Sequence, residues 1–138
     1  MIALTLTDDK SDPQYERSAE AYDYLMSVTD AKGRKLEVHK IHQPNPTLIA
    51  PEEAEGVDAV DGTLPREAGD RMAASYINFY FCNDGAVVPT FGDSHDAQAL
   101  EMLQKLLPER RVVGVPAREI LLGGGNIHCI TQQQPRGK

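Results

Sequence analysis

The strongest constraint on the fold is a pattern that occurs twice along the chain: an apolar strand, an acidic turn, a helix and a second strand. The first copy spans residues 2–41 and the second spans residues 86–115, with Thr7-Asp8 and Phe91-Gly92-Asp93 at equivalent places. Repeat architectures usually need about three or more units to bury a continuous core. We therefore expect a mixed α/β fold that belongs to something larger or completes itself by oligomerising.

The first copy has clear boundaries. Residues 2–7 are apolar and β-branched, which predicts a strand. Pro13 fits the first turn of a helix, with Asp12 or Ser11 as the N-cap, because proline lacks only an amide that would be unpaired there. Apolar positions then recur at helical spacing as far as Thr29, and Gly33 marks the end of the helix. Residues 36–41 predict the next strand.

The second copy is preceded by a hairpin signal. Residues 76–83 and 85–91 predict two strands joined by a turn at Asn83-Asp84-Gly85. Gly92-Asp93-Ser94 opens a helix that Pro108 stops, and residues 111–115 predict a further strand. Residues 43–71 are rich in proline and acid and predict a long loop with a short helix near residues 51–56. Such a loop is either functional or a plain surface connection. We treat residues 1–138 as a single domain.

Composition excludes several classes of protein. Apolar residues make up 41% and charged residues 25% of the chain, as in ordinary globular domains. The net charge of −7 disfavours nucleic-acid binding. No apolar run approaches the roughly 20 residues of a membrane span, and the N-terminus has no signal-peptide pattern. Two cysteines do not make a disulfide framework, so we expect a reducing, cytoplasmic setting. The four histidines lack metal-binding spacing.

The segment most informative about chemistry is residues 123–129, in which three glycines precede a cysteine. A glycine run is tolerated where the backbone turns sharply or lies against a ligand. Cys129 is therefore a candidate nucleophile, which would need its thiolate form. The alternative is a structural cysteine beside a flexible loop. If the segment is extended, His128 and Cys129 point to opposite faces, and an activating histidine has to come from elsewhere.

A family resemblance rests on four segments. Residues 121–133 (LLGGGNIHCITQQ) resemble the catalytic-cysteine segment of agmatine deiminases. Residues 62–71 (GTLPREAGDR) with 74–80 (ASYINFY) are similar to the same family, as are residues 12–17 (DPQYER) and 88–93 (VPTFGD). The segments occur in order along almost the whole chain. The resemblance is therefore to the C-terminal portion of an agmatine deiminase, related to the bacterial peptidylarginine deiminases of the pentein superfamily.

The resemblance implies a five-bladed α/β propeller, of which this chain would form about two ββαβ-type blades. It also implies a hydrolase acting on C–N bonds of amidines, which converts agmatine to N-carbamoylputrescine and ammonia in putrescine biosynthesis without metal or organic cofactor. Cys129 would be the nucleophile that forms an amidino-thioether. The residues at the substrate would be Asn78, Gly124, Gly125 and Asn126. On the expected strand, Asn78 shares one face with Tyr80 and Cys82.

One departure from the family is serious. The chain has no Gly-His-x-Asp/Glu segment upstream of Cys129, and the carboxylate that holds the guanidinium lies earlier still in the family. Loss of acid–base help alone costs ~10²–10⁴-fold in rate. We therefore expect the chain to be incomplete for catalysis, unless a homo-oligomer or missing upstream blades supply these groups. Two other hypotheses are a non-catalytic module that keeps part of a cationic-ligand cleft, and a peptidylarginine deiminase or amidinotransferase relative.

Overall fold

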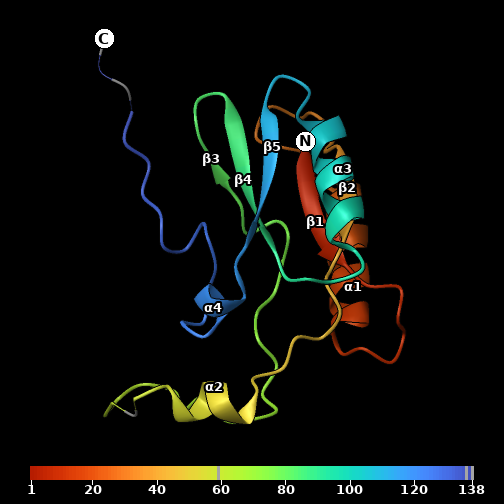
Figure 1. Cartoon of the computed structure of the whole chain (residues 1–138). Helices are drawn as coiled ribbons and strands as arrows, with labels where there is room; N and C mark the ends of the chain where they lie inside the picture. Colours follow the sequence, from red (N-terminus) through yellow and green to blue (C-terminus); the bar gives the residue numbers. More distant parts are fainter. Residues whose placement is uncertain (59, 136, 138) are drawn as a thin grey trace.

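The computed structural model describes residues 1–58, 60–135 and 137, which form two α/β units (Figure 1). In the first unit, β1 (Ile2–Leu6) is followed by α1 (Gln14–Ser27) and β2 (Val38–His42). The two strands pair in parallel, with Ile2 opposite Val38. Because parallel neighbours need a crossover connection, α1 is the element that makes this pairing possible.

The second unit has the same crossover with one strand added in front. It contains β3 (Tyr80–Phe81), β4 (Gly85–Thr90), α3 (Asp96–Leu106) and β5 (Arg111–Pro116). β3 pairs antiparallel with β4, and β4 pairs parallel with β5. The second unit is therefore ββαβ, whereas the first is βαβ in the part that the structure describes. The prediction of a mixed α/β fold is confirmed.

The two units share one core. Its members come from β2, β4, α3 and the segment before β3, and the buried ones are Ile41, Tyr76, Val88, Ala99 and Leu103. Two polar contacts reinforce the junction: the rings of His42 and His95 stack with centroids 4.1 Å apart, and Asn45 Nδ2 donates to Asp93 Oδ2 at 2.9 Å. Apolar side chains from both units are therefore buried against each other at one place.

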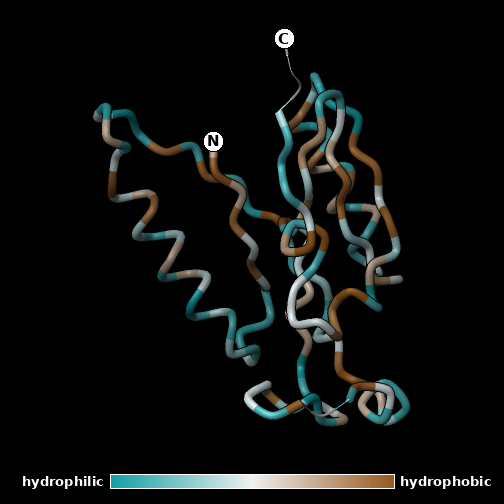
Figure 2. The backbone as a smooth tube through the Cα atoms, turned by 90° about the vertical axis from the view of Figure 1, so that its left-hand side faces the viewer, coloured by the Kyte–Doolittle hydropathy of each residue, from teal (hydrophilic) through white to brown (hydrophobic). Residues whose placement is uncertain are grey.

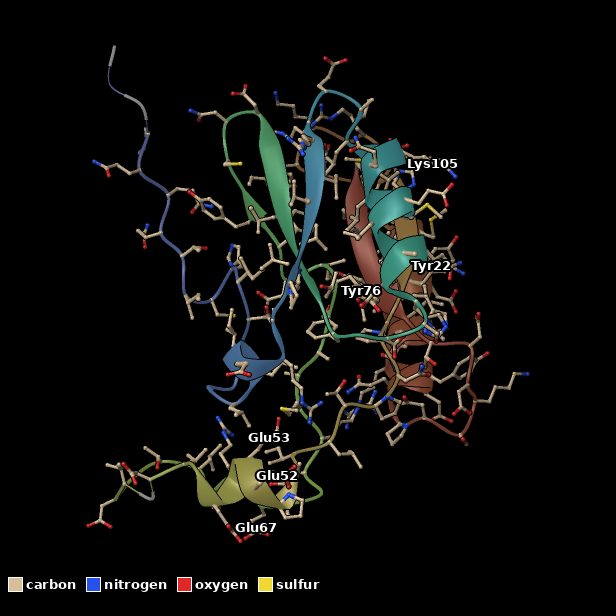
Figure 3. The ribbon with its side chains drawn as sticks, in the orientation of Figure 1. Tyr22, Glu52, Glu53, Glu67, Tyr76 and Lys105 are labelled. Atoms are coloured by element: carbon tan, nitrogen blue, oxygen red, sulfur yellow. The ribbon has the colours of Figure 1, made fainter. Side chains whose placement is uncertain are left out.

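Tyr76 is the polar member of this core, and Figure 3 shows it between the second sheet and the first unit. Its side chain is fully buried, and its hydroxyl donates to Asp96 Oδ1 at 2.8 Å. Burial, and then the neighbouring carboxylate of Asp96, raise the pKa of Tyr76 far above its ordinary value. The phenol therefore stays protonated and serves as a donor that fixes the start of α3.

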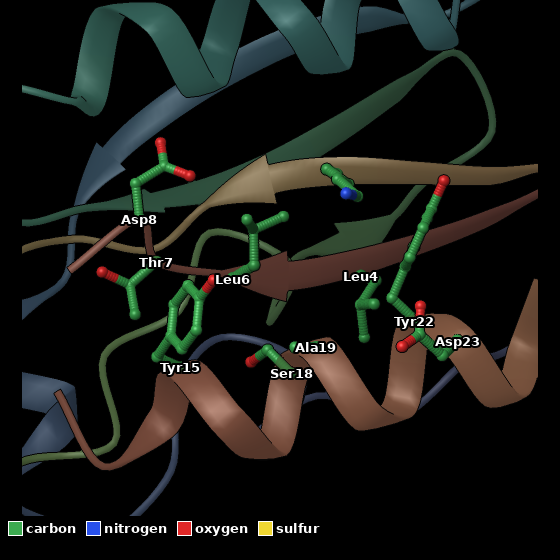
Figure 4. A pocket seen from close by; sticks show the side chains of 10 residues that line it. Leu4, Leu6, Thr7, Asp8, Tyr15, Ser18, Ala19, Tyr22 and Asp23 are labelled. Atoms are coloured by element: carbon green, nitrogen blue, oxygen red, sulfur yellow. The ribbon is translucent and has the colours of Figure 1, made fainter. Parts of the chain in front are cut away.

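Helix α1 is a surface element of the fold. It has no buried residue and lies against β1 and β2 on the side away from the second unit (Figure 2). Because side chains alternate along a strand, Leu4 and Leu6 face α1 while Ala3 packs on the shared core. Leu4, Leu6, Tyr15 and other residues line a pocket of about 250 Å³ between strand and helix (Figure 4). No helix among the described residues is long and apolar enough to cross a membrane.

The segment 43–71 contains the short helix α2 (Pro51–Glu55), as the sequence predicts. Two of its contacts with the rest of the chain involve the short helix α4 (Arg118–Leu121). Arg118 opens α4 and places its guanidinium on Glu53, with both nitrogen–oxygen distances 2.8 Å (Figure 3 labels Glu53). Ile49, Met72 and Leu121 form a second, smaller core. The long segment is therefore packed against α4.

Two predicted elements differ from the structure. The strand expected over residues 76–83 is confirmed only at Tyr80 and Phe81, which pair with β4, and the prediction is wrong for residues 76–79. The Asn78 amide instead donates to the Ser75 carbonyl at 3.2 Å in a turn, with the Tyr76 side chain drawn into the core. The first helix ends at Ser27, since Val28 is extended. Aromatic and apolar residues favour a strand locally, but core contacts decide their conformation here.

Candidate active site

Cys129 lies in a series of tight turns that follow α4. Gly124 donates its amide to the Leu121 carbonyl at 2.8 Å, and the Cys129 amide donates to the Asn126 carbonyl at 2.8 Å. The Cys129 side chain is exposed. Residues 127–130 form turns, so the condition that the segment is extended is not met, and alternation along a strand does not fix the direction of the His128 ring.

Asn78 is in direct contact with the thiol. Its side-chain nitrogen Nδ2 donates to Cys129 Sγ at 3.3 Å, and its Oδ1 accepts the His128 backbone amide at 3.0 Å. The His128 amide can only donate, so it holds the amide oxygen on its own side and leaves the NH₂ group facing the sulfur. The family resemblance already predicts Asn78 at this site. The strand face on which Asn78 was expected beside Cys82 does not exist in the structure.

The pKa of the Cys129 thiol is lowered from its ordinary value. The hydrogen bond from the Asn78 amide is the main cause, and a backbone hydrogen bond from Asn126 adds to it, against a smaller opposing effect of burial. Hydrogen bonds to the charged form favour that form. An exposed thiol with a raised thiolate fraction is the state that nucleophilic attack requires.

The glycine run leaves room for these contacts. A Cβ on Gly125 would lie 2.8 Å from Cys129 Sγ, which is closer than real atoms approach. Gly124 has a φ of +89°, and a Cβ there would lie 2.5 Å from Arg66 Nη2. Glycine is therefore needed at both positions: Gly125 lies beside the thiol, and Gly124 lies beneath the Arg66 guanidinium.

Asn126 is buried instead of lining an open surface. Its side-chain nitrogen donates to the Ala117 carbonyl at 3.2 Å, and its Oδ1 accepts the Ile127 amide at 2.8 Å. These contacts anchor the turn that carries Cys129. Of the four residues expected at the substrate, Asn78 and Gly125 adjoin the thiol, Gly124 adjoins Arg66, and Asn126 supports the backbone. Their roles toward a substrate stay predictions.

The groups around the thiol are few. Within residues 1–58, 60–135 and 137, no histidine or carboxylate makes a hydrogen bond to Cys129 Sγ, and no three potential metal ligands gather. The pocket between α1 and β1 includes neither Asn78 nor Cys129. Sequence reasoning missed Arg66 as a neighbour of the glycine run. The only hint was its place in the GTLPREAGDR segment, which the resemblance already included.

Comparison with known proteins identifies the family. Residues 1–135 match the model of the Porphyromonas-type peptidyl-arginine deiminase family, and the chain belongs to that family. A Listeria monocytogenes relative, provisionally named agmatine deiminase 1, is 66% identical over 99% of this chain and 38% of its own length. The agmatine deiminase of Medicago truncatula is 55% identical over 97% of this chain and 36% of its own length.

A solved structure supports the same assignment. The agmatine deiminase of Enterococcus faecalis is 47% identical and superposes with a TM-score of 0.91, covering 97% of this chain and 36% of that one. The expected resemblance to agmatine deiminases is thus confirmed, as is the kinship with pentein structures. The chain spans less than two fifths of the length of each of these relatives.

Proposed function

We propose that this chain carries the nucleophile for the hydrolysis of agmatine to N-carbamoylputrescine and ammonia. The Cys129 thiolate attacks the guanidinium carbon and forms a C–S bond, and ammonia leaves after taking up a proton. Water then adds to the amidino-thioether carbon, the C–S bond breaks, and the thiolate is regenerated with the urea product. This chemistry needs a reduced thiol, which agrees with a cytoplasmic setting.

The contact between Asn78 and Cys129 is the observation that carries the proposal. The Cys129 sulfur is exposed and accepts a hydrogen bond from the Asn78 side chain, and the pKa of the thiol is lowered. A buried structural cysteine would have neither property. Relatives at 55–66% identity are named agmatine deiminases, and this is the reason for proposing agmatine as the substrate. Asn78 would sit beside the substrate, and the glycines would shape the backbone at the cleft.

The isolated chain should be a weak catalyst. Attack on a guanidinium needs an acid to protonate the leaving ammonia, and no histidine or carboxylate bonds to the thiol among the described residues. We propose that further residues, from a longer chain or from a second copy, supply this group and the anionic clamp for the guanidinium. The exposed apolar side chains of Val113 and Val115, which share one face of β5, would favour such association. A monomer in sedimentation velocity at all concentrations would contradict association of the isolated chain with itself.

The test is mass spectrometry of the chain after incubation with agmatine. The matched variants are Cys129→Ser and Cys82→Ser, since both cysteines are exposed but only Cys129 is assigned a role. We expect an amidino adduct that is lost in Cys129→Ser and kept in Cys82→Ser. Release of N-carbamoylputrescine would mean that the acid and base groups are present in the chain or its oligomer. Equal product from Cys129→Ser would refute Cys129 as the nucleophile.

A second substrate class has some support. The family model is named for peptidyl-arginine deiminases, and the structure of a protein from Porphyromonas gingivalis that is named an arginine deiminase superposes with a TM-score of 0.78 at 27% identity. Protection of the thiol discriminates between the two classes. Agmatine should slow alkylation of Cys129 at lower concentration than an arginine-containing peptide does. The reverse order would move the assignment to the peptide substrate.

A further inference from the structure

Arg66 reaches the glycine run from the far end of the long segment 43–71. Its Nε donates to the Leu122 carbonyl at 3.0 Å. Its Nη2 lies 2.5 Å from the point that a Cβ on Gly124 would occupy, so the guanidinium rests on the bare backbone of that glycine. One planar side chain therefore contacts two positions of the turn, and arginine is suited to this because its donors form a rigid fork.

Arg66 is itself held in place. The turn that follows it is tied to Ile49 in both directions: the Gly69 amide donates to the Ile49 carbonyl at 2.8 Å, and the Ile49 amide donates to the Asp70 carbonyl at 2.9 Å. Ile49 belongs to the buried cluster with Met72 and Leu121. The backbone next to Arg66 is therefore anchored to packed residues, and the Arg66 guanidinium approaches the glycine turn from a fixed direction.

Arg66 contacts the glycine run at the residue that precedes the glycine beside the Cys129 thiol. Gly124, under the guanidinium, is followed by Gly125, whose backbone adjoins Cys129 Sγ. We propose that Arg66 is a positioning residue for Cys129, because its guanidinium fixes the glycine turn that presents the sulfur to Asn78. This inference rests on the proposed function only in taking Cys129 as the reacting group.

The test measures the pH dependence of Cys129 alkylation by iodoacetamide in the full chain, with Cys82→Ser as the background so that one thiol reacts. The variants are Arg66→Met and Arg66→Lys, with Arg17→Met on the exposed face of α1 as the matched control. We expect both Arg66 variants to move the midpoint of the profile upward by about half a pH unit, which is roughly threefold less thiolate below it. Arg17→Met should leave the midpoint in place.

The outcomes separate positioning from other roles. An unchanged midpoint in folded Arg66→Met, even with lower stability toward urea, would overturn the proposal, since a merely structural residue would not move the profile. A midpoint that shifts in Arg66→Met but not in Arg66→Lys would assign the effect to charge and would also overturn it. If Arg66→Met does not fold, Arg66→Lys decides alone. The assay contains no agmatine, so its result is independent of the agmatine test: equal product from Cys129→Ser would refute the proposed function without changing the alkylation profile.

Discussion

The side chain of Asn78 donates a hydrogen bond to Cys129 Sγ across 3.3 Å, although the two residues are 51 positions apart in the sequence. Each lies in a turn, and the His128 amide joins the two turns by donating to Asn78 Oδ1 at 3.0 Å. The environment of the thiol therefore depends on how two turns from different parts of the chain pack together. A donor at the sulfur stabilises the thiolate.

Asn78→Asp should suppress the reactivity of Cys129. A carboxylate beside the sulfur replaces a donor by a like charge, which raises the pKa of the thiol and shifts its alkylation profile to higher pH. We expect alkylation at pH 7 to slow by about tenfold, which corresponds to roughly one pKa unit. Asn78→Ala, which removes the donor without adding charge, should slow it less. Rates that match the unmodified chain across the pH range would rule out Asn78 as the stabilising donor.

Asp12 should make the fold sensitive to acid. Its carboxylate is buried and accepts Arg71 at 2.8 and 3.0 Å, with Gln43 and the Gln14 amide as further donors. These hydrogen bonds, that of Arg71 first, lower the pKa of Asp12 from 3.8 to about 2. A carboxylate with a depressed folded pKa contributes stability above its unfolded pKa, and this contribution is lost as pH falls from about 4 through about 2.

The matching substitution is Asp12→Asn, which should lower the free energy of unfolding by about 2 kcal/mol at neutral pH. It should also flatten the dependence of stability on pH between about 4 and 2. Urea denaturation at several pH values measures both effects. Glu101→Gln is the control, because its ion pair with Lys105 is exposed and screened by solvent, so its loss should change stability little. An Asp12→Asn variant as acid-sensitive as the parent chain would contradict the argument.

The sequence predicts most of the regular elements and little of the site geometry. The crossover units were predictable because apolar periodicity and turn residues such as Asp12, which accepts the Gln14 amide, act locally, although the N-cap of α1 is Pro13 and not the expected Asp12 or Ser11. The strand expected over residues 76–83 is reduced to Tyr80–Phe81, because Tyr76 turns into the core to reach Asp96. The glycine run made Cys129 a candidate and the resemblance assigned its role, Asn78 came from the resemblance alone, and the contacts of Arg66 depend on the packing of segment 43–71. Such contacts join distant segments and leave no periodic signal.

Tyr76→Phe should destabilise the fold mildly. The lost hydroxyl donates to Asp96 Oδ1 at 2.8 Å, and one such bond contributes about 1 kcal/mol. Asp96→Ala should cost about 2–4 kcal/mol, since the Tyr76 hydroxyl and the Phe91 and Gly92 amides would all lose their acceptor. Tyr24→Phe is the control, because its ring is 66% exposed. Equal losses for Tyr76→Phe and Tyr24→Phe in urea denaturation would mean that the buried hydroxyl contributes nothing.

Gly125→Ala should impair the thiol while leaving most of the fold intact. The added Cβ would lie 2.8 Å from Cys129 Sγ, so the sulfur has to move away from Asn78. Gly123→Ala is a matched control in the same run, since its Cβ would meet only the Ile120 carbonyl at 3.3 Å. We expect alkylation of Cys129 at pH 7 to slow by about tenfold in the first variant and by less than about twofold in the second. Similar rates in the two variants would show that the space at Gly125 does not set the position of the sulfur.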